Sequence, residues 1–95
     1  MLQTKPRSGT VTAVIAGELD HFAAPQIRRM LDELLMDPTI THLVLDLENL
    51  TFMDSSGIGL ILGRQRCART LGGSLRIQHA PEQLRRVLQL AGIPS

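Results

Sequence analysis

The chain has 95 residues, of which 43% are hydrophobic and 20% charged, and its net charge is +1. That length and composition suit a single folded domain over residues 1–95 with a modest core, and they argue against a disordered chain. Near-neutrality and only two aromatic residues, Phe22 and Phe52, argue against nucleic-acid binding, and no apolar run approaches the roughly 20 residues of a membrane span.

The first half of the chain predicts a β-hairpin followed by a helix. Residues 10–16 alternate and are rich in β-branched side chains, which is typical of a strand. Residues 2–6 can pair with this strand, although Pro6 has no N–H to give to the ladder. An amphipathic helix is predicted over residues 24–36, where apolar residues recur at helical spacing, and it ends before Pro38.

The second half predicts two further strand–helix units. Residues 42–47 are nearly continuously apolar, as in a strand buried on both faces, and residues 48–54 are expected to form a loop. Ser55 or Ser56 is expected to cap a helix that runs to about Leu71. The closing elements are a short alternating strand and an amphipathic helix, over residues 74–78 and 81–91.

This order of elements predicts an α/β fold, with a mixed, mostly parallel sheet of about four strands and three helices. Loops at the carboxyl edge of such a sheet usually carry the function. We expect Met30, Met36 and the helix leucines in the core, and Arg64 with the other helix arginines on solvated faces.

The numbers and positions of cysteine and histidine limit which metal sites and disulfides the chain can form. The single cysteine, Cys67, fits a buried position and a reducing cytosol, and the polar first nine residues predict no secretory signal. No Cys/His cluster has metal-ligand spacing, so neither a metal nor a cofactor is expected.

The most informative stretch is residues 49–63, which places an acid, two serines and three glycines at the entrance of a helix. A catalytic serine would need a histidine base and an orienting partner, but His21, His42 and His79 are scattered along the chain. The serines also lack the glycine-flanked elbow of the α/β-hydrolases. The glycines follow the pattern GxGxxxG, which is not the dinucleotide fingerprint, and no Gly-Lys-Ser/Thr follows. Both kinds of site are therefore disfavoured.

A serine at a helix start can instead be a modification site. Its hydroxyl is exposed, and phosphorylation adds a charge of about −1.5 to −2. Next to Asp54, such a group would concentrate negative charge in a small patch and could switch a binding surface. An ordinary helix cap explains the same residues, so the residue chemistry alone leaves both interpretations open.

Four segments resemble the anti-sigma-factor antagonists of the STAS-domain family in spore-forming and related bacteria. They are residues 43–63, with the specific run Phe52–Gly57, and residues 16–20, 71–73 and 90–93. The resemblance implies a cytoplasmic, monomeric STAS domain without catalytic activity, in which Ser55 is phosphorylated. It also implies two partners: an anti-sigma factor that is an ATP-dependent serine kinase, and a serine phosphatase. The unphosphorylated form would bind the kinase and free its sigma factor, in sporulation or a stress response.

The same resemblance implies a docking surface around the phosphorylated serine. We expect it to include Asp20, His21, Asp54, Ser56, Gly57, Gly59 and Arg64. Helix capping is the alternative role of Asp20 and Asp54. Gly57 is expected to let the partner's active site approach, whereas for Gly59 tight packing is an equal alternative.

One departure from the family concerns the end of the chain. Family members usually continue with a further strand and helix, which this sequence is expected to lack. An alternative function keeps the fold without the switch, as a scaffold domain in a transporter or a stress-signalling assembly. A serine at position 55 favours the switch, because such scaffold relatives often lack it.

Overall fold

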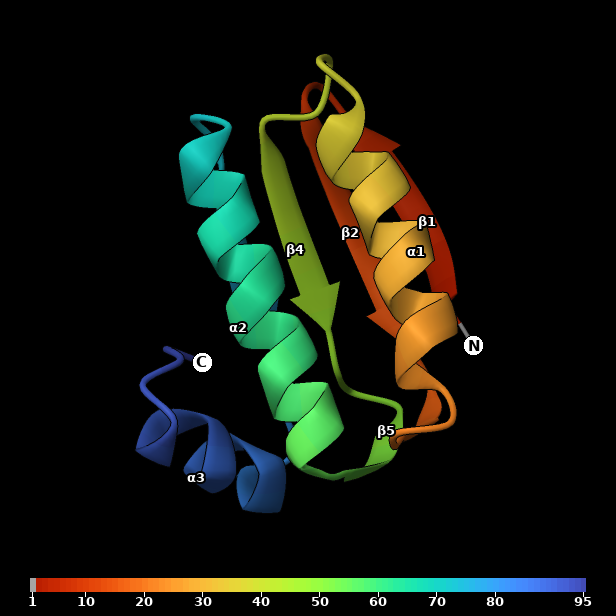
Figure 1. The fold of residues 1–95 in the computed structure, drawn as a ribbon, viewed down its shortest axis with the longest axis vertical. Coiled ribbons are helices and arrows are strands. Elements are labelled where there is room, and N and C mark those ends of the chain that lie inside the picture. Colours follow the sequence, from red (N-terminus) through yellow and green to blue (C-terminus); the bar gives the residue numbers. More distant parts are fainter. Residues whose placement is uncertain (1) are drawn as a thin grey trace.

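The computed structural model describes residues 2–95, which form six strands and three helices (Figure 1). In chain order these are β1 (Leu2–Arg7), β2 (Thr10–Ile15), β3 (Gly17–Leu19), α1 (Ala24–Met36), β4 (His42–Asp46), β5 (Leu50–Met53), α2 (Ser55–Thr70), β6 (Ser74–Gln78) and α3 (Glu82–Leu90). The bounds of α1 agree with the predicted helix over residues 24–36, and α2, β6 and α3 lie within one or two residues of their predictions.

The main sheet has four strands in the order β1-β2-β4-β6. β1 is antiparallel to β2, whereas β2, β4 and β6 are parallel to one another. The predicted hairpin and the mixed, mostly parallel sheet are both confirmed. Pro6 is accommodated because β1 is an edge strand, where a missing N–H breaks no central ladder.

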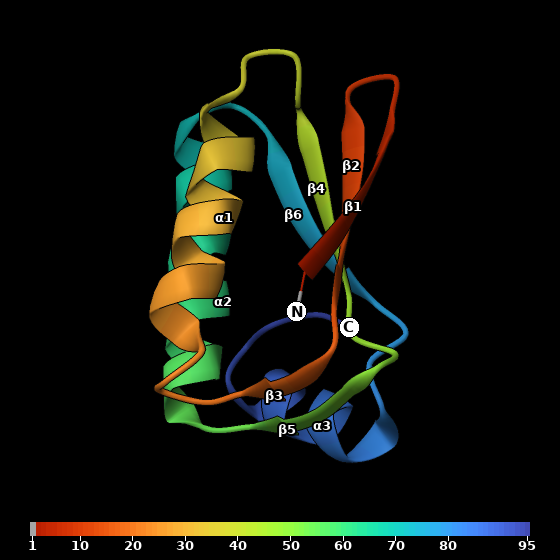
Figure 2. The same cartoon turned by 90° about the vertical axis from the view of Figure 1, so that its right-hand side faces the viewer.

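Helices α1 and α2 lie side by side over one face of this sheet, and no helix of the described residues covers the other face (Figure 2). The strands alternate accordingly, so that every second residue points to the helices. The buried residues on that side include Val11, Ala13, Ile15, Leu43, Leu45, Leu75 and Ile77. β4 is buried on both faces, as its apolar run predicts, since Val44 and Asp46 on the helix-free face are each 9% exposed.

β3 and β5 form a separate parallel pair below the main sheet, beside α3 (Figure 2). The prediction of a loop over residues 48–54 is therefore wrong for Leu50–Met53. Leu50 and Met53 are buried but the two residues between them are exposed, so β5 lacks the strict alternation that predicts a strand. The pair closes the lower end of the core with Leu19, which is fully buried.

Not every apolar helix residue is in the core. Met36, at the end of α1, is 73% exposed, so its predicted core position is wrong. α3 buries Leu88 fully and leaves Leu90 exposed. No helix within residues 2–95 is both long and apolar enough to cross a membrane.

Candidate functional site

The β3–β5 pair brings two loops together at one edge. The strands are parallel, with Leu19 opposite Met53, so the residues that follow them leave the pair side by side. One loop runs from Asp20 into α1, and the other consists of Asp54 at the start of α2. The residues predicted around Ser55 are thus gathered by a strand pair that the sequence pattern does not predict.

Asp54 is the N-cap of α2, and the expectation that Ser55 or Ser56 caps this helix is wrong. Asp54 Oδ1 accepts hydrogen bonds from the backbone N–H groups of Ser56, at 2.9 Å, and Gly57, at 3.3 Å. Its Oδ2 accepts one from the backbone N–H of His21, at 3.1 Å. One carboxylate therefore caps α2 and fixes the loop before α1.

The same hydrogen bonds set the charge state of Asp54. Desolvation is the largest single effect and raises the pKa of this carboxyl. The N–H groups of Ser56, Gly57 and His21, with the His21 ring, together outweigh it and lower the pKa below its ordinary value. Asp54 is accordingly ionised at neutral pH.

Ser55 is the first residue of α2, and its side chain is exposed. Within residues 2–95 its hydroxyl makes no hydrogen bond, and no histidine faces it as a base. The three histidine rings contact other groups instead. The His21 ring lies near the Asp54 carboxylate, and the His42 and His79 rings are hydrogen-bonded to Ser74 and Asp46. Ser56 is half-buried, so of the two serines Ser55 is the more accessible.

The loop before α1 is ordered by Asp20. Its Oδ1 accepts hydrogen bonds from the N–H groups of Phe22, at 3.1 Å, and Ala23, at 2.9 Å. Asp20 thereby orders the turn before α1 but does not cap the helix, whose N-cap is Ala23 and has no side-chain cap hydrogen bond. His21 Nδ1 lies 3.8 Å from Asp54 Oδ2, and the His21 ring contacts Phe22 with centroids 4.0 Å apart. Phe22 is 81% exposed and was not among the predicted site residues, although an exposed aromatic beside a functional loop is a common docking feature.

The two glycines differ from expectation. Gly57 is buried, and a Cβ there would lie 2.5 Å from Met53 Cγ and 2.8 Å from the carbonyl oxygen of Leu19. Gly57 therefore serves the close packing of α2 on the β3–β5 pair, and this packing accounts for a glycine at position 57 without a partner. A Cβ on Gly59 would meet nothing within 4 Å, so Gly59 is the glycine that leaves α2 open to approach.

Arg64 is also placed differently from expectation. Its side chain is 8% exposed, and its Nε lies 3.2 Å from Asp32 Oδ1 on α1. Its Nη1 donates to Asp32 Oδ2 at 3.5 Å. Arg64 joins α2 to α1 rather than lying on a solvated face, and its guanidinium is paired with Asp32.

A groove of about 590 Å³ runs from the Ser56 turn along the seam between α1 and α2. Its lining includes His21, Arg28, Arg29, Ser56, Gly59 and Gly63, and no acidic residue. The open groove and the exposed Ser55 next to it form a surface suited to another protein rather than an enclosed ligand pocket.

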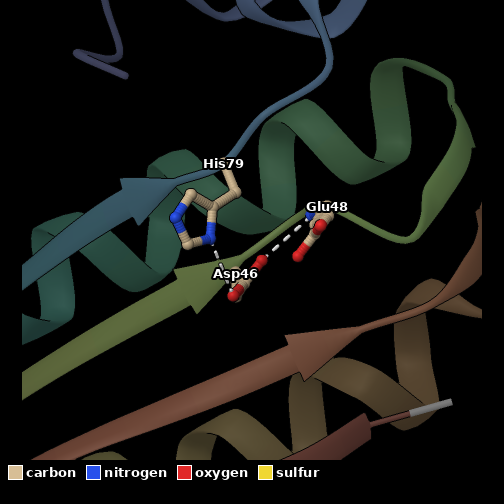
Figure 3. A group of neighbouring side chains, drawn as sticks. All are labelled: Asp46, Glu48 and His79. Carbon is tan, nitrogen blue, oxygen red and sulfur yellow. Dashed lines mark hydrogen bonds and ion pairs between the residues drawn. The ribbon is translucent and has the colours of Figure 1, made fainter.

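Potential metal ligands lie elsewhere. Asp46, Glu48 and His79 come together at the carboxyl ends of β4 and β6 (Figure 3). The sequence analysis predicts no metal site, because these residues are brought together only by the pairing of β4 with β6.

Comparison with known proteins agrees with this fold. The STAS domain model matches residues 1–95. An anti-sigma F factor antagonist of Paenibacillus polymyxa is 34% identical over 92 residues, which are 97% of this chain and 79% of that protein. The anti-sigma factor antagonist SpoIIAA in its unphosphorylated form matches with a TM-score of 0.80 and 34% identity, over 95% of this chain and 83% of that one. The phosphorylated form of the Bacillus cell fate determinant SpoIIAA matches with a TM-score of 0.81 and 34% identity, over 98% of this chain and 85% of that one.

The match spans all the elements described above, including the β3–β5 pair and the start of α2. Sequence and fold agree with relatives whose names describe anti-sigma factor antagonists. The chain therefore belongs to the STAS domain family.

Proposed function

We propose that this chain is an anti-sigma-factor antagonist whose binding is switched by phosphorylation of Ser55. The observation that carries this proposal is the exposed Ser55 hydroxyl, directly after the Asp54 cap. Relatives named as antagonists, with one structure in a phosphorylated form, support it. The unphosphorylated chain binds an anti-sigma factor and so frees its sigma factor, and the phosphorylated chain does not.

The capping geometry supports a switch that acts by charge. The N–H groups of Ser56 and Gly57 already bond the Asp54 carboxylate, so they are not free to neutralise a phosphate on Ser55. A phosphate would therefore present its charge outward, next to an ionised Asp54. A partner closing over this patch would have to desolvate an unpaired dianion, which costs several kcal/mol. Since every ~1.4 kcal/mol is a tenfold change in affinity, binding falls by orders of magnitude.

The proposed partners are those that the resemblance to anti-sigma-factor antagonists implies. The anti-sigma factor is also the ATP-dependent serine kinase, and a serine phosphatase restores the free hydroxyl. The chain acts as a cytoplasmic monomer and has no catalysis of its own. The docking surface comprises Ser55 with Asp20, His21, Asp54, Ser56 and Gly59, to which we add Phe22.

Incubation with ATP and a candidate anti-sigma kinase, followed by intact-mass measurement, tests the proposal. We expect one added phosphate in the wild type and in Ser56→Ala, and none in Ser55→Ala. Phosphopeptide sequencing should place the phosphate on Ser55. The scaffold alternative predicts no phosphate in any variant, and a phosphate on Ser56 would contradict the assignment.

A further inference from the structure

Three potential metal ligands meet on the helix-free face of the sheet (Figure 3). Asp46 ends β4, Glu48 follows two residues later, and His79 comes directly after β6. Asp46 Oδ2 lies 3.1 Å from His79 Nδ1, and one ligand atom from each of the three residues lies within 4.8 Å of the others. The set combines one imidazole nitrogen with two carboxylates, so it is more than a group of acids.

These separations suit one small cation. Zn²⁺ holds nitrogen and oxygen ligands at about 2.0–2.2 Å, so neighbouring ligand atoms of one ion lie roughly 3–3.5 Å apart. The Asp46–His79 pair already has this separation. Glu48 is exposed, and within residues 2–95 its carboxylate makes no hydrogen bond or ion pair, so it can close on an ion held by the other two.

Hydrogen bonds from neighbouring residues orient the Asp46 carboxylate, as the side chains and backbone groups around a metal site orient its ligands. Gln78, its neighbour in the β4–β6 register, donates from Nε2 to Asp46 Oδ2 at 3.2 Å. The backbone N–H of Glu48 donates to Oδ1 at 3.0 Å.

His79 adopts a backbone conformation that side-chain-bearing residues rarely take, with a φ of 56°. In this conformation its ring lies against Asp46 while 60% of the side chain stays exposed. An incoming ion can therefore reach Nδ1 without opening the core.

We propose that Asp46, Glu48 and His79 bind a divalent transition-metal ion of the zinc class, with water completing the coordination. An imidazole ligand favours such ions, whereas Mg²⁺ and Ca²⁺ are bound through oxygen. The simpler alternative is that His79 and Asp46 form only an ion pair.

Calorimetric titration of ZnCl₂ into the metal-free full chain distinguishes the two. We expect saturable binding of about one ion per chain, weakened at least tenfold in His79→Gln and also weakened in Glu48→Gln. Both side chains are exposed, so neither variant should unfold, and circular dichroism checks this.

Two other histidines provide matched controls. His42 lies at the opposite end of β4 and contacts Ser74, and His21 lies beside Asp54. His42→Gln and His21→Gln should bind Zn²⁺ as the wild type does, and Zn²⁺ should shift the amide resonances of Glu48 and His79. Absence of saturable binding, or equal binding by His79→Gln and the wild type, would overturn the proposal.

Discussion

At the scale of single residues, Asp54 both caps α2 and lies next to the proposed phosphorylation site, Ser55. Its carboxylate accepts hydrogen bonds from three backbone N–H groups, two in the first turn of α2 and one at His21. An ionised acid is the best acceptor for these donors, and it lies where the partial positive charge of the helix N-terminus favours it. Replacing it should therefore loosen both α2 and the neighbouring loop.

Asp54→Ala should lower the melting temperature at pH 7, and the difference from the wild type should shrink in acid. Because the folded pKa of Asp54 is lowered, its stabilisation is present above the unfolded carboxyl pKa of about 4. This stabilisation is lost as the pH falls through the lower folded value. Thermal unfolding from pH 7 to pH 2 measures the effect. Asp54→Asn keeps a capping oxygen, so its melting temperature should lie between those of the wild type and Asp54→Ala. A melting-temperature difference that does not depend on pH would contradict the argument.

The two glycines of the first turns give opposite predictions. Gly57→Ala should destabilise the protein by about 1–3 kcal/mol, because the new methyl group overlaps Met53 and the Leu19 carbonyl. For a domain of this size each kcal/mol lowers the melting temperature by about 4–8 °C. Gly59→Ala, with open space at its Cα, should instead stabilise the helix by about 0.5–1 kcal/mol.

Kinase binding by the two folded variants then tests the docking surface. Gly59→Ala should weaken binding or slow phosphorylation, because its methyl group enters the groove between α1 and α2. Folded Gly57→Ala should bind normally, because its methyl group is buried. Normal binding by Gly59→Ala would remove this glycine from the proposed surface.

At the scale of elements, one ion pair joins the two helices that cover the sheet. Arg64 on α2 is buried and contacts Asp32 on α1, and Asp32 also lies 3.8 Å from Arg28. The Arg64 stem packs in the interface while its guanidinium reaches the half-exposed carboxylate. This pair keeps the two walls of the groove at a fixed separation.

Arg64→Ala should cost about 1–3 kcal/mol, less than the loss of a fully buried pair, because Asp32 can be solvated again. Denaturant unfolding measures the change. The exposed neighbour Arg66 is the matched control, and Arg66→Ala should change stability by no more than about 0.5 kcal/mol. Equal effects of the two substitutions would show that the Asp32 contact contributes nothing.

At the scale of the whole molecule, phosphorylation should change the surface and leave the fold intact. The partial positive charge of the helix N-terminus tolerates an added phosphate. Ser55 is exposed, so the phosphate would not enter the core. Amide chemical shifts should therefore change around residues 20–23 and 54–60 and stay constant across the main sheet. Shifts throughout β2, β4 and β6 would indicate a rearrangement and contradict a switch based on charge.

The parts that the sequence alone determined are those with a regular local pattern. The strand over residues 10–15, α1, β6 and α3 repeat apolar residues at a strand or helix period, and residues 42–47 form a nearly continuous apolar run. Both patterns depend only on near neighbours. The run Phe52–Gly57 was sufficient to identify the family and to single out Ser55. These predictions needed no knowledge of how distant segments meet.

The tertiary structure alone decided the contacts between distant segments. The β3–β5 pair is too short and irregular to predict, yet it brings His21 to Asp54, 33 residues away. Arg64 is buried because α1 supplies Asp32 from 32 residues earlier. Gly57 is a packing residue because Leu19 lies against it, and His79 meets Asp46 because β4 pairs with β6. In each case the residue type alone suggests an exposed or independent role, and a segment far along the chain changes how the residue is buried or paired.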